Sequence, residues 1–186
     1  MESLSQSTLQ NVDFTLKKKH RITLLLDLVI LEDYYFIAMG KFQKITTCLW
    51  YDNQANEAAA FYCSLFPNSR VTSSSAMIVE FELEGTKFMA MNGGPKYQLS
   101  EASSLFVLCD DQEEVDRLWE ILTSDGGEES RCGWCKDKFG LSWQIIPKRF
   151  TEMIQTGTSE QKQRVFQAMM PMNKLIVDEF EKAFNQ

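Results

Sequence analysis

Histidine is nearly absent from this chain of 186 residues, in which His20 is the only one. A Ser–His–Asp hydrolase needs an imidazole beside its nucleophile, and a zinc site usually draws on several imidazole or thiolate ligands. His20 also precedes the regular pattern of strands and helices, which begins near Lys44. We therefore expect no hydrolytic triad, and no pattern in the sequence localises a pair of catalytic carboxylates.

Basic charge and long apolar runs are also scarce. The chain has 19 Lys and Arg residues against 26 Asp and Glu, with a formal net charge of −7. A protein that binds duplex nucleic acid needs a basic face to neutralise phosphates, so we expect no nucleic-acid partner. The only dense basic run, 17–21, precedes the apolar run 22–31, which contains Asp27 and is too short to cross a bilayer. We expect no membrane partner.

The N-terminal run resembles a signal peptide, but two acidic residues follow it where a small-residue cleavage site would stand. We interpret residues 1–40 as an N-terminal extension outside the core, with Met39 as the more usual start. The alternative is a genuine N-terminal helix or strand that docks on the domain.

The five cysteines are an odd number spread over half the chain, which is typical of reduced thiols in the cytoplasm. Cys132 and Cys135 form a C-x-x-C, but strand-like sequence flanks them. On a strand the two would face opposite ways, with Cα atoms about 10 Å apart at ~3.3 Å per residue. A disulfide requires roughly 4.4–6.8 Å, and no second pair completes a zinc ribbon. We expect neither redox nor metal chemistry from this pair.

A repeated order of elements stands out against these absences. The pattern predicts a strand over 45–51, a helix that ends before Pro67, and strands near 70–75, 77–84 and 87–91. The second half predicts a strand over 104–109, a helix, and strands over 133–136 and 141–146. When the two halves of the sequence are aligned with an offset of 58 residues, Phe61 falls on Trp119. A helical tail is predicted after them, over 150–184.

Capping residues predict where the helices begin. Asp52 and Asn53 offer an N-cap for the first helix, and Asp110 or Asp111 for the second, with Glu113 placed for a capping box to Asp110. The second helix should bury Val115, Leu118, Trp119 and Leu122. Thr158 and Gln161 have the spacing of a further capping box in the tail.

A hairpin is predicted around the turn DKFG at 137–140. With Lys138 and Phe139 at the tip, Trp134 lies opposite Trp143, Cys135 opposite Ser142, and Gly133 opposite Gln144. One face then carries both tryptophans and suits packing under a helix. The other carries Gly133, Cys135, Ser142 and Gln144, which suits a small, semi-polar pocket.

Three segments resemble a known family: KITTCLWYDNQANEAAAFYCSLFPNSRV, FELEGTKFMAMNGGP and CGWCKDKFGLSWQIIP. They are similar to the PhnB-like, 3-demethylubiquinone methyltransferase-like branch of the vicinal oxygen chelate superfamily, which includes glyoxalase I, bleomycin-resistance proteins and extradiol dioxygenases. The resemblance implies an α+β fold over 41–186, with two βαβββ modules (about 44–95 and 103–147) in a curled, cup-shaped mixed sheet. It also implies a homodimer.

Metal-using members of the superfamily bind a divalent ion with four inward side chains, typically His and Glu. The resemblance places these positions near Thr46 or Thr47, near 89–91, near Ser104 and at Gln144, and none of them is His or Glu here. We therefore predict no metal and no cofactor. Glu80, Glu82 and Glu84 alternate on one strand, which is typical of a solvated face.

These features favour a cytoplasmic small-molecule-binding protein, or a metal-independent enzyme whose catalytic residues the sequence does not identify. The pocket candidates are Trp50, Met91, Asn92, Cys135, Ser142 and Gln144. One alternative is a metal-dependent lyase, isomerase or dioxygenase of the same fold. The other is a 3-demethylubiquinone methyltransferase, although neither Gly93-Gly94 nor Gly126-Gly127 has the context of a nucleotide-binding turn between a strand and a helix.

Overall fold

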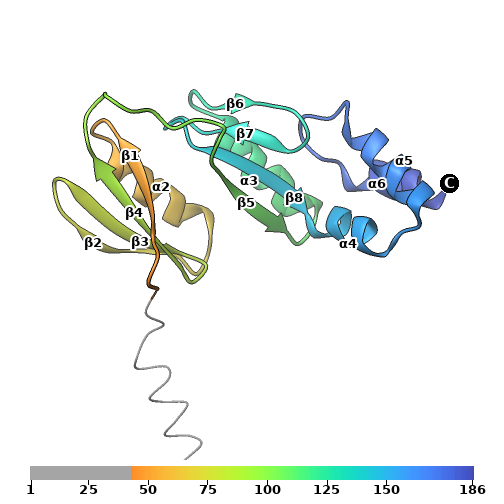
Figure 1. The fold of residues 1–186 in the computed structure, drawn as a ribbon, viewed down its shortest axis with the longest axis horizontal. Coiled ribbons are helices and arrows are strands. Elements are labelled where there is room, and N and C mark those ends of the chain that lie inside the picture. The colour runs from red at the N-terminus through yellow and green to blue at the C-terminus, as the bar shows by residue number, and fades with distance from the viewer. Residues whose placement is uncertain (1–42) are drawn as a thin grey trace, which may run out of the picture. The chain divides into compact units, whose positions relative to one another are not determined.

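The computed structural model describes residues 43–186 (Figure 1). The chain divides into two units, residues 1–45 and 46–186, and the second unit holds every element described below. The predicted N-terminal extension over 1–40, together with His20, lies outside the described residues.

The first βαβββ module contains strand β1 (Thr47–Tyr51), helix α2 (Ala55–Leu65) and strands β2 (Arg70–Ser74), β3 (Ile78–Leu83) and β4 (Thr86–Asn92). Its strand order is β1-β4-β3-β2, with β1 and β4 parallel and the other pairs antiparallel. Helix α2 covers one face of this sheet, which we call sheet 1, and leaves the strand β1 at an open edge (Figure 1).

The second module repeats this order. It contains β5 (Ser104–Cys109), α3 (Gln112–Thr123), β6 (Glu128–Glu129), β7 (Trp134–Lys136) and β8 (Ser142–Pro147), and its sheet 2 has the order β5-β8-β7-β6. The strands β5 and β8 are parallel. The predicted α+β fold with two βαβββ modules is confirmed. The short strand β6 has no counterpart in the predicted elements.

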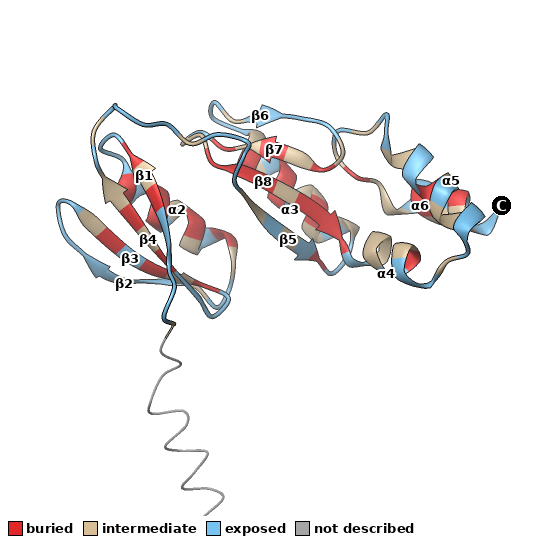
Figure 2. Cartoon of the chain, viewed as in Figure 1, coloured by how far each residue is buried: buried red, intermediate tan, exposed pale blue. Residues whose placement is uncertain are grey.

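Burial alternates along the strands and distinguishes two faces of each sheet. In β1, Leu49 and Tyr51 are buried, whereas Cys48 is exposed and Trp50 is half-buried. In β8, Trp143 and Ile145 are buried in the same core as the helix residues Tyr62 and Leu118. The buried residues follow α2, α3 and the central strands (Figure 2). We call the side of each sheet that turns away from its helix the outer face.

Aromatic rings join the two modules through their helix-facing sides. Tyr62 of α2 contacts Trp143 of β8 with ring centroids 5.4 Å apart, and Phe66 stacks on the same tryptophan at 6.2 Å. Phe139 lies edge-on to Tyr62 at 6.0 Å. Buried aromatic pairs of this kind each contribute about 0.5–1.5 kcal/mol beyond their buried area. The two modules therefore share one hydrophobic core.

A buried carboxylate, Asp137, lies within this core with a side chain only 1% exposed. It accepts hydrogen bonds from the backbone N–H groups of Phe139 (2.8 Å) and Leu141 (3.1 Å) and from the indole of Trp143 (2.8 Å). The Tyr62 hydroxyl lies near this carboxylate, and its oxygen is 3.0 Å from that of Tyr51. Burial raises the pKa of Asp137 because these bonds only partly offset the loss of hydration.

The predicted hairpin register is wrong by one residue. Cys135 pairs with Trp143, Trp134 with Gln144, and Lys136 with Ser142. The reason is the turn. Asp137 N–H donates to the Leu141 carbonyl (2.9 Å) and its carboxylate accepts from the same loop, so three residues, rather than two, separate the residues that close the turn. A shift of one residue exchanges the faces of the facing strand. The two tryptophans therefore do not share a face.

The helix starts agree in part with the capping predictions. Asp111 caps α3 by accepting from Glu114 N–H (2.9 Å), and Thr158 and Gln161 form the predicted capping box. The return bond to Asp110 N–H comes from Glu114 (2.8 Å) and not from Glu113. Asp52 and Asn53 do not cap α2, because a distant side chain, Asn92 of β4, accepts from Ala55 N–H there (2.8 Å).

The C-terminal tail forms helices α4 (Lys148–Thr156), α5 (Ser159–Met169) and α6 (Val177–Asn185) around a second core of Ile146, Met153, Val165, Leu175 and Phe180. Gln112 of α3 anchors it with two bonds: its amide nitrogen donates to Leu175 O (3.1 Å) and its amide oxygen accepts from Val177 N–H (2.8 Å). No helix within residues 43–186 is long and apolar enough to cross a membrane.

We expect the Asp137→Asn variant to lose about 1–3 kcal/mol of unfolding free energy, because an amide NH₂ would face the indole N–H of Trp143 and leave a buried donor unpaired. Urea denaturation followed by circular dichroism measures this change. The control is Asp52→Asn, an exposed position where we expect a change within about 0.5 kcal/mol. Equal losses in the two variants would contradict the role given to Asp137.

Comparison of the wild type with Asp137→Asn at several pH values tests the raised pKa of Asp137. The folded wild type holds this proton more tightly than the unfolded chain does, so the contribution of Asp137 to stability falls as the pH rises from 3.8, its ordinary pKa, to the raised value. The asparagine side chain of the variant does not titrate. The stability difference between wild type and Asp137→Asn should therefore narrow as the pH rises through that window.

Candidate functional site

The outer face of sheet 1 presents aromatic and sulfur-containing side chains that no helix of its module covers. Cys48 and Trp50 come from β1 and Met89 and Met91 from β4, and the parallel register pairs Cys48 with Met89 and Trp50 with Met91. Cys48 is exposed and the other three are half-buried. The sequence-predicted residues Trp50 and Met91 are therefore direct neighbours on one surface.

Trp50 is fixed in position by the segment that follows β4. Its indole nitrogen donates to the Gly94 carbonyl (2.8 Å), and the ring of Tyr97 meets it edge-on at 5.1 Å. The ring lies against the backbone of Gly93, where a Cβ atom would come within 2.2 Å of the ring carbons. Glycine at position 93 thus allows the ring to lie flat beside the chain. A locked aromatic ring is a preorganised surface for a ligand.

Asn92 has a structural task at the end of the same strand. Its amide oxygen accepts from Ala55 N–H at the start of α2, and its amide nitrogen donates to the Ala76 carbonyl (2.9 Å). Both ends of the side chain are therefore engaged by backbone groups. The structure does not bring Asn92 together with Trp50 and Met91 on the outer face.

The remaining sequence-predicted residues belong to sheet 2. Ser142 and Gln144 alternate with the buried Trp143 and so lie on the outer face, where the Gln144 amide donates to the Ser104 hydroxyl (2.9 Å). Ser142 is only 1% exposed, and its hydroxyl has no hydrogen-bond partner among the described residues. This buried hydroxyl is a polar group that a ligand or water would satisfy.

Cys135 does not share that face, which corrects the prediction drawn from the hairpin. It pairs with Trp143 on the helix-facing side and is 2% exposed. Burial raises the pKa of its thiol to about 12, so the thiol stays protonated at neutral pH. Cys132 instead lies in the preceding turn with φ +58°, and both sulfurs are free thiols. The C-x-x-C thus lies on a bend and a strand rather than along a single strand.

Sequence reasoning missed a cleft of about 560 Å³ between the end of sheet 1 and strand β5. Its walls are mainly apolar, with charged groups among them: Phe66, Pro67, Leu83, Glu84, Thr86, Phe88, Leu105, Phe106, Val107, Leu108, Asp110, Glu114, Trp143 and Lys148. Lys148, the first residue of α4, forms an ion pair with Asp110, which directly follows β5. The one available signal was the run of apolar residues in 105–108.

The donors on the outer faces do not fit a divalent ion of the superfamily's usual kind. Thr46, Ser104 and Gln144 offer hydroxyl and amide oxygens, and Ser104 and Gln144 are bonded to each other. No group of three or more His, Cys, Asp or Glu side chains within 43–186 is placed to hold a metal ion. A hard or borderline divalent ion needs several such ligands to offset its dehydration.

Two curled βαβββ modules with open outer faces define the vicinal oxygen chelate class of proteins. A family model described as 3-demethylubiquinone-9 3-methyltransferase matches residues 43–146, and the chain belongs to this family, the PhnB-like branch of that superfamily. The match ends at the last residue but one of β8, before the C-terminal helices.

A solved structure agrees with this assignment. A protein from Bacillus cereus titled a putative 3-demethylubiquinone-9 3-methyltransferase, PhnB protein, is 31% identical over 56% of this chain and 99% of its own, with a TM-score of 0.54. PA1353 from Pseudomonas aeruginosa is 18% identical over 56% of this chain and 97% of its own, with a TM-score of 0.47. The fosfomycin resistance protein FosX from Listeria monocytogenes, complexed with Mn(II) and sulfate, is 18% identical over 55% of this chain and 86% of its own, with a TM-score of 0.43. No curated protein matches the chain in sequence.

We expect Gly93→Ala to displace Trp50, because the new methyl group would overlap the indole ring. The substitution should cost about 1–3 kcal/mol of unfolding free energy in the wild-type background. In a Trp50→Ala background the same substitution should cost less than about 0.5 kcal/mol, since the overlapping ring is gone. Urea denaturation of the four proteins of this cycle measures both values, and additive losses would count against the packing described.

Proposed function

We propose that this protein binds a small organic molecule on the outer faces of its sheets without a divalent metal ion. The observation that carries the proposal is the uncovered, locked ring of Trp50 beside Met91. Ligand sites are mostly apolar and aromatic, with a few fixed polar groups that orient the ligand. The half-buried ring is held at the sheet face by three residues of the following loop, Gly93, Gly94 and Tyr97.

Sheet 2 supplies the polar part of the proposed site. The Gln144 amide nitrogen is bonded to Ser104, which leaves the amide oxygen to accept from a ligand. The Ser142 hydroxyl has no partner among the described residues, and an unpaired buried hydroxyl costs about 1–3 kcal/mol. A ligand with one donor and an apolar ring would match these groups. The same groups would serve a metal-independent enzyme of this fold, for which no catalytic residue is assigned.

A second copy of the chain would complete the cup, so we propose a homodimer. The strands β1 and β5 are both open edges of their sheets. On β5, Phe106 and Leu108 are 56% and 45% exposed, and open edges with apolar side chains are surfaces that proteins normally cover. Symmetric dimers are the commonest oligomers of soluble proteins. All five cysteines are free thiols, which supports a reducing, cytoplasmic location.

The family's description favours a second candidate, a methyltransferase that acts on 3-demethylubiquinone. The two glycine pairs speak against a nucleotide-like cofactor: Gly93-Gly94 follows β4 and precedes no helix, and Gly126-Gly127 follows α3. Calorimetric titration with millimolar S-adenosylmethionine separates the candidates. Only the methyltransferase must bind this molecule, and the calorimeter would record that binding as heat. The metal-dependent lyase, isomerase or dioxygenase would instead require a stoichiometric divalent ion in the purified protein.

We expect Trp50→Ala and Met91→Ala each to weaken binding of the fluorescent probe 8-anilinonaphthalene-1-sulfonate at least tenfold, because each removes apolar contact surface from the proposed site. Fluorescence titration measures the dissociation constant, and addition of a chelator should leave it unchanged. The matched control is Met170→Ala, an exposed methionine of the tail. Unaltered binding in both site variants would remove this site from consideration.

We expect Phe106→Glu to convert the homodimer into a monomer, since a charge on the open β5 edge would oppose its burial against a second copy. Sedimentation velocity measures the molecular mass. Phe166→Glu is the control, because Phe166 is 44% exposed on α5 and lies outside both modules. A wild-type protein that sediments as a monomer, or a dimer that survives Phe106→Glu, would contradict the proposed dimer surface.

A further inference from the structure

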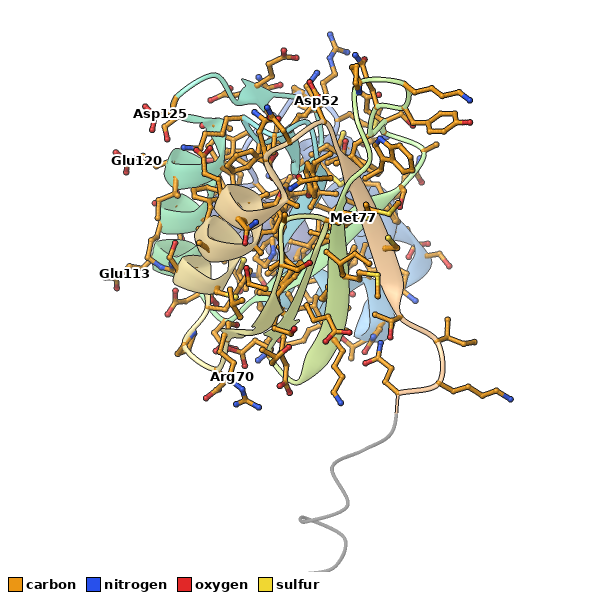
Figure 3. All side chains as sticks on the ribbon, turned by 90° about the vertical axis from the view of Figure 1, so that its left-hand side faces the viewer. Asp52, Arg70, Met77, Glu113, Glu120 and Asp125 are labelled. Atoms are coloured by element: carbon orange, nitrogen blue, oxygen red, sulfur yellow. The ribbon has the colours of Figure 1, made fainter. Side chains whose placement is uncertain are left out.

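Three residues with sulfur-containing side chains, Cys48, Met89 and Met91, share the outer face of sheet 1 on the adjacent strands β1 and β4. The parallel register places Cys48 directly beside Met89, and Met91 lies two residues further on the same face of β4. Neighbouring strands are about 4.8 Å apart and same-face residues about 7 Å apart, within reach of flexible methionine side chains. Figure 3 shows sulfur atoms, in yellow, grouped beside Met77 over β1 and β4.

Packing does not explain this cluster. Methionines usually fill gaps in a core, but Met89 and Met91 lie on the face that α2 does not cover, and Cys48 is exposed. By contrast, Cys109 and Cys135 are buried, and burial raises the pKa of each thiol to about 12. Cys48 is therefore a thiol that solvent reaches, with two thioethers beside it.

The surroundings of the cluster suit a cation. Glu80 of β3 pairs with Met89 and is exposed, so a carboxylate continues the row from Cys48 through Met89. The neighbouring Glu82 is neutralised by Arg70 at 2.9 Å, whereas Glu80 forms no ion pair among the described residues. Met89 and Glu80 also line a neighbouring hollow of about 360 Å³, whose walls include the basic residues Arg70 and Lys87 as well as Glu82.

We propose that Cys48, Met89 and Met91 bind a soft monovalent metal ion, Cu(I) or Ag(I). Thiolate and thioether sulfurs select soft ions, while the divalent ions of the superfamily need several imidazole and carboxylate ligands together, and no such group occurs within residues 43–186. On binding, the Cys48 thiol releases one proton to solvent and its sulfur bonds to the metal. The metal keeps its charge of +1, so no oxidant or reductant is consumed.

This site goes beyond the proposed function and does not depend on it. Met91 belongs to both sites, so a bound soft metal would compete with an organic ligand for this part of the face. Cys48 and Met89 belong to the metal site alone. The Cys48→Ser variant should therefore lose the metal and still bind 8-anilinonaphthalene-1-sulfonate, which separates failure of one proposal from failure of the other.

The test is anaerobic titration with Cu(I) in competition with the chelator bathocuproine disulfonate, followed by the absorbance of the chelator complex. The protein carries Cys63→Ser and Cys132→Ser, which removes the two other thiols that are not fully buried. We expect one Cu(I) per chain with three sulfur neighbours in its X-ray absorption spectrum. The double variant Met89→Leu/Met91→Leu should bind at least a hundredfold more weakly, and Met170→Leu should bind as tightly as the parent.

Leucine conserves volume, so the double variant should keep its fold, and thermal unfolding checks this directly. Affinity that is lost in Cys48→Ser but unchanged in the methionine double variant would reduce the site to a single reactive thiol and overturn the proposal. A Cu(I) affinity too weak to compete with the chelator in the parent protein would overturn it as well.

Discussion

The buried carboxylate of Asp137 determines which residues each face of sheet 2 presents. Removal of an aspartate from water is costly unless its oxygens are bonded, and here two backbone N–H groups and an indole provide those bonds. The bonds set the length of the turn and therefore the register of β7 and β8. The indole belongs to Trp143, whose ring also contacts Tyr62 of α2, so the residue that Asp137 binds connects the two modules.

The outer faces of this chain present a different set of donor side chains from those of the metal-using members of the superfamily. Where the superfamily's resemblance implies inward imidazoles and carboxylates, this chain carries methionine, serine and glutamine. Amide and hydroxyl groups orient organic molecules, and thioethers contact both apolar surfaces and soft ions. Both proposals, the ligand site and the Cu(I) site, therefore depend on which side chains the strands present, since the order of the strands is that of the superfamily.

Local patterns in the sequence predicted most of the architecture, and long-range contacts account for what they missed. The spacing of Val115, Leu118, Trp119 and Leu122 marked α3 because one helix face is buried, and all four are buried. The hairpin register depended on the burial of Asp137, which the letters DKFG do not reveal. The cap of α2 comes from Asn92, 37 residues after the residue it caps. Of the proposed site, Trp50 and Met91 were predicted from the sequence, whereas the cleft and the Cys48–Met89 pairing required the strand order.

The two hydrogen bonds that Gln112 makes to the tail bear on how much of the chain folds as one unit. The family match stops at residue 146, yet the second core begins with Ile146 itself and closes only with Leu175 and Phe180. Backbone carbonyls of Met172 and Asn173 also accept from the N–H groups of Cys132 and Gly133. A version trimmed to the family length would cut through a hydrophobic core and remove the acceptors of two backbone N–H groups, so we expect the second module of this chain to need the helices after β8 for its stability.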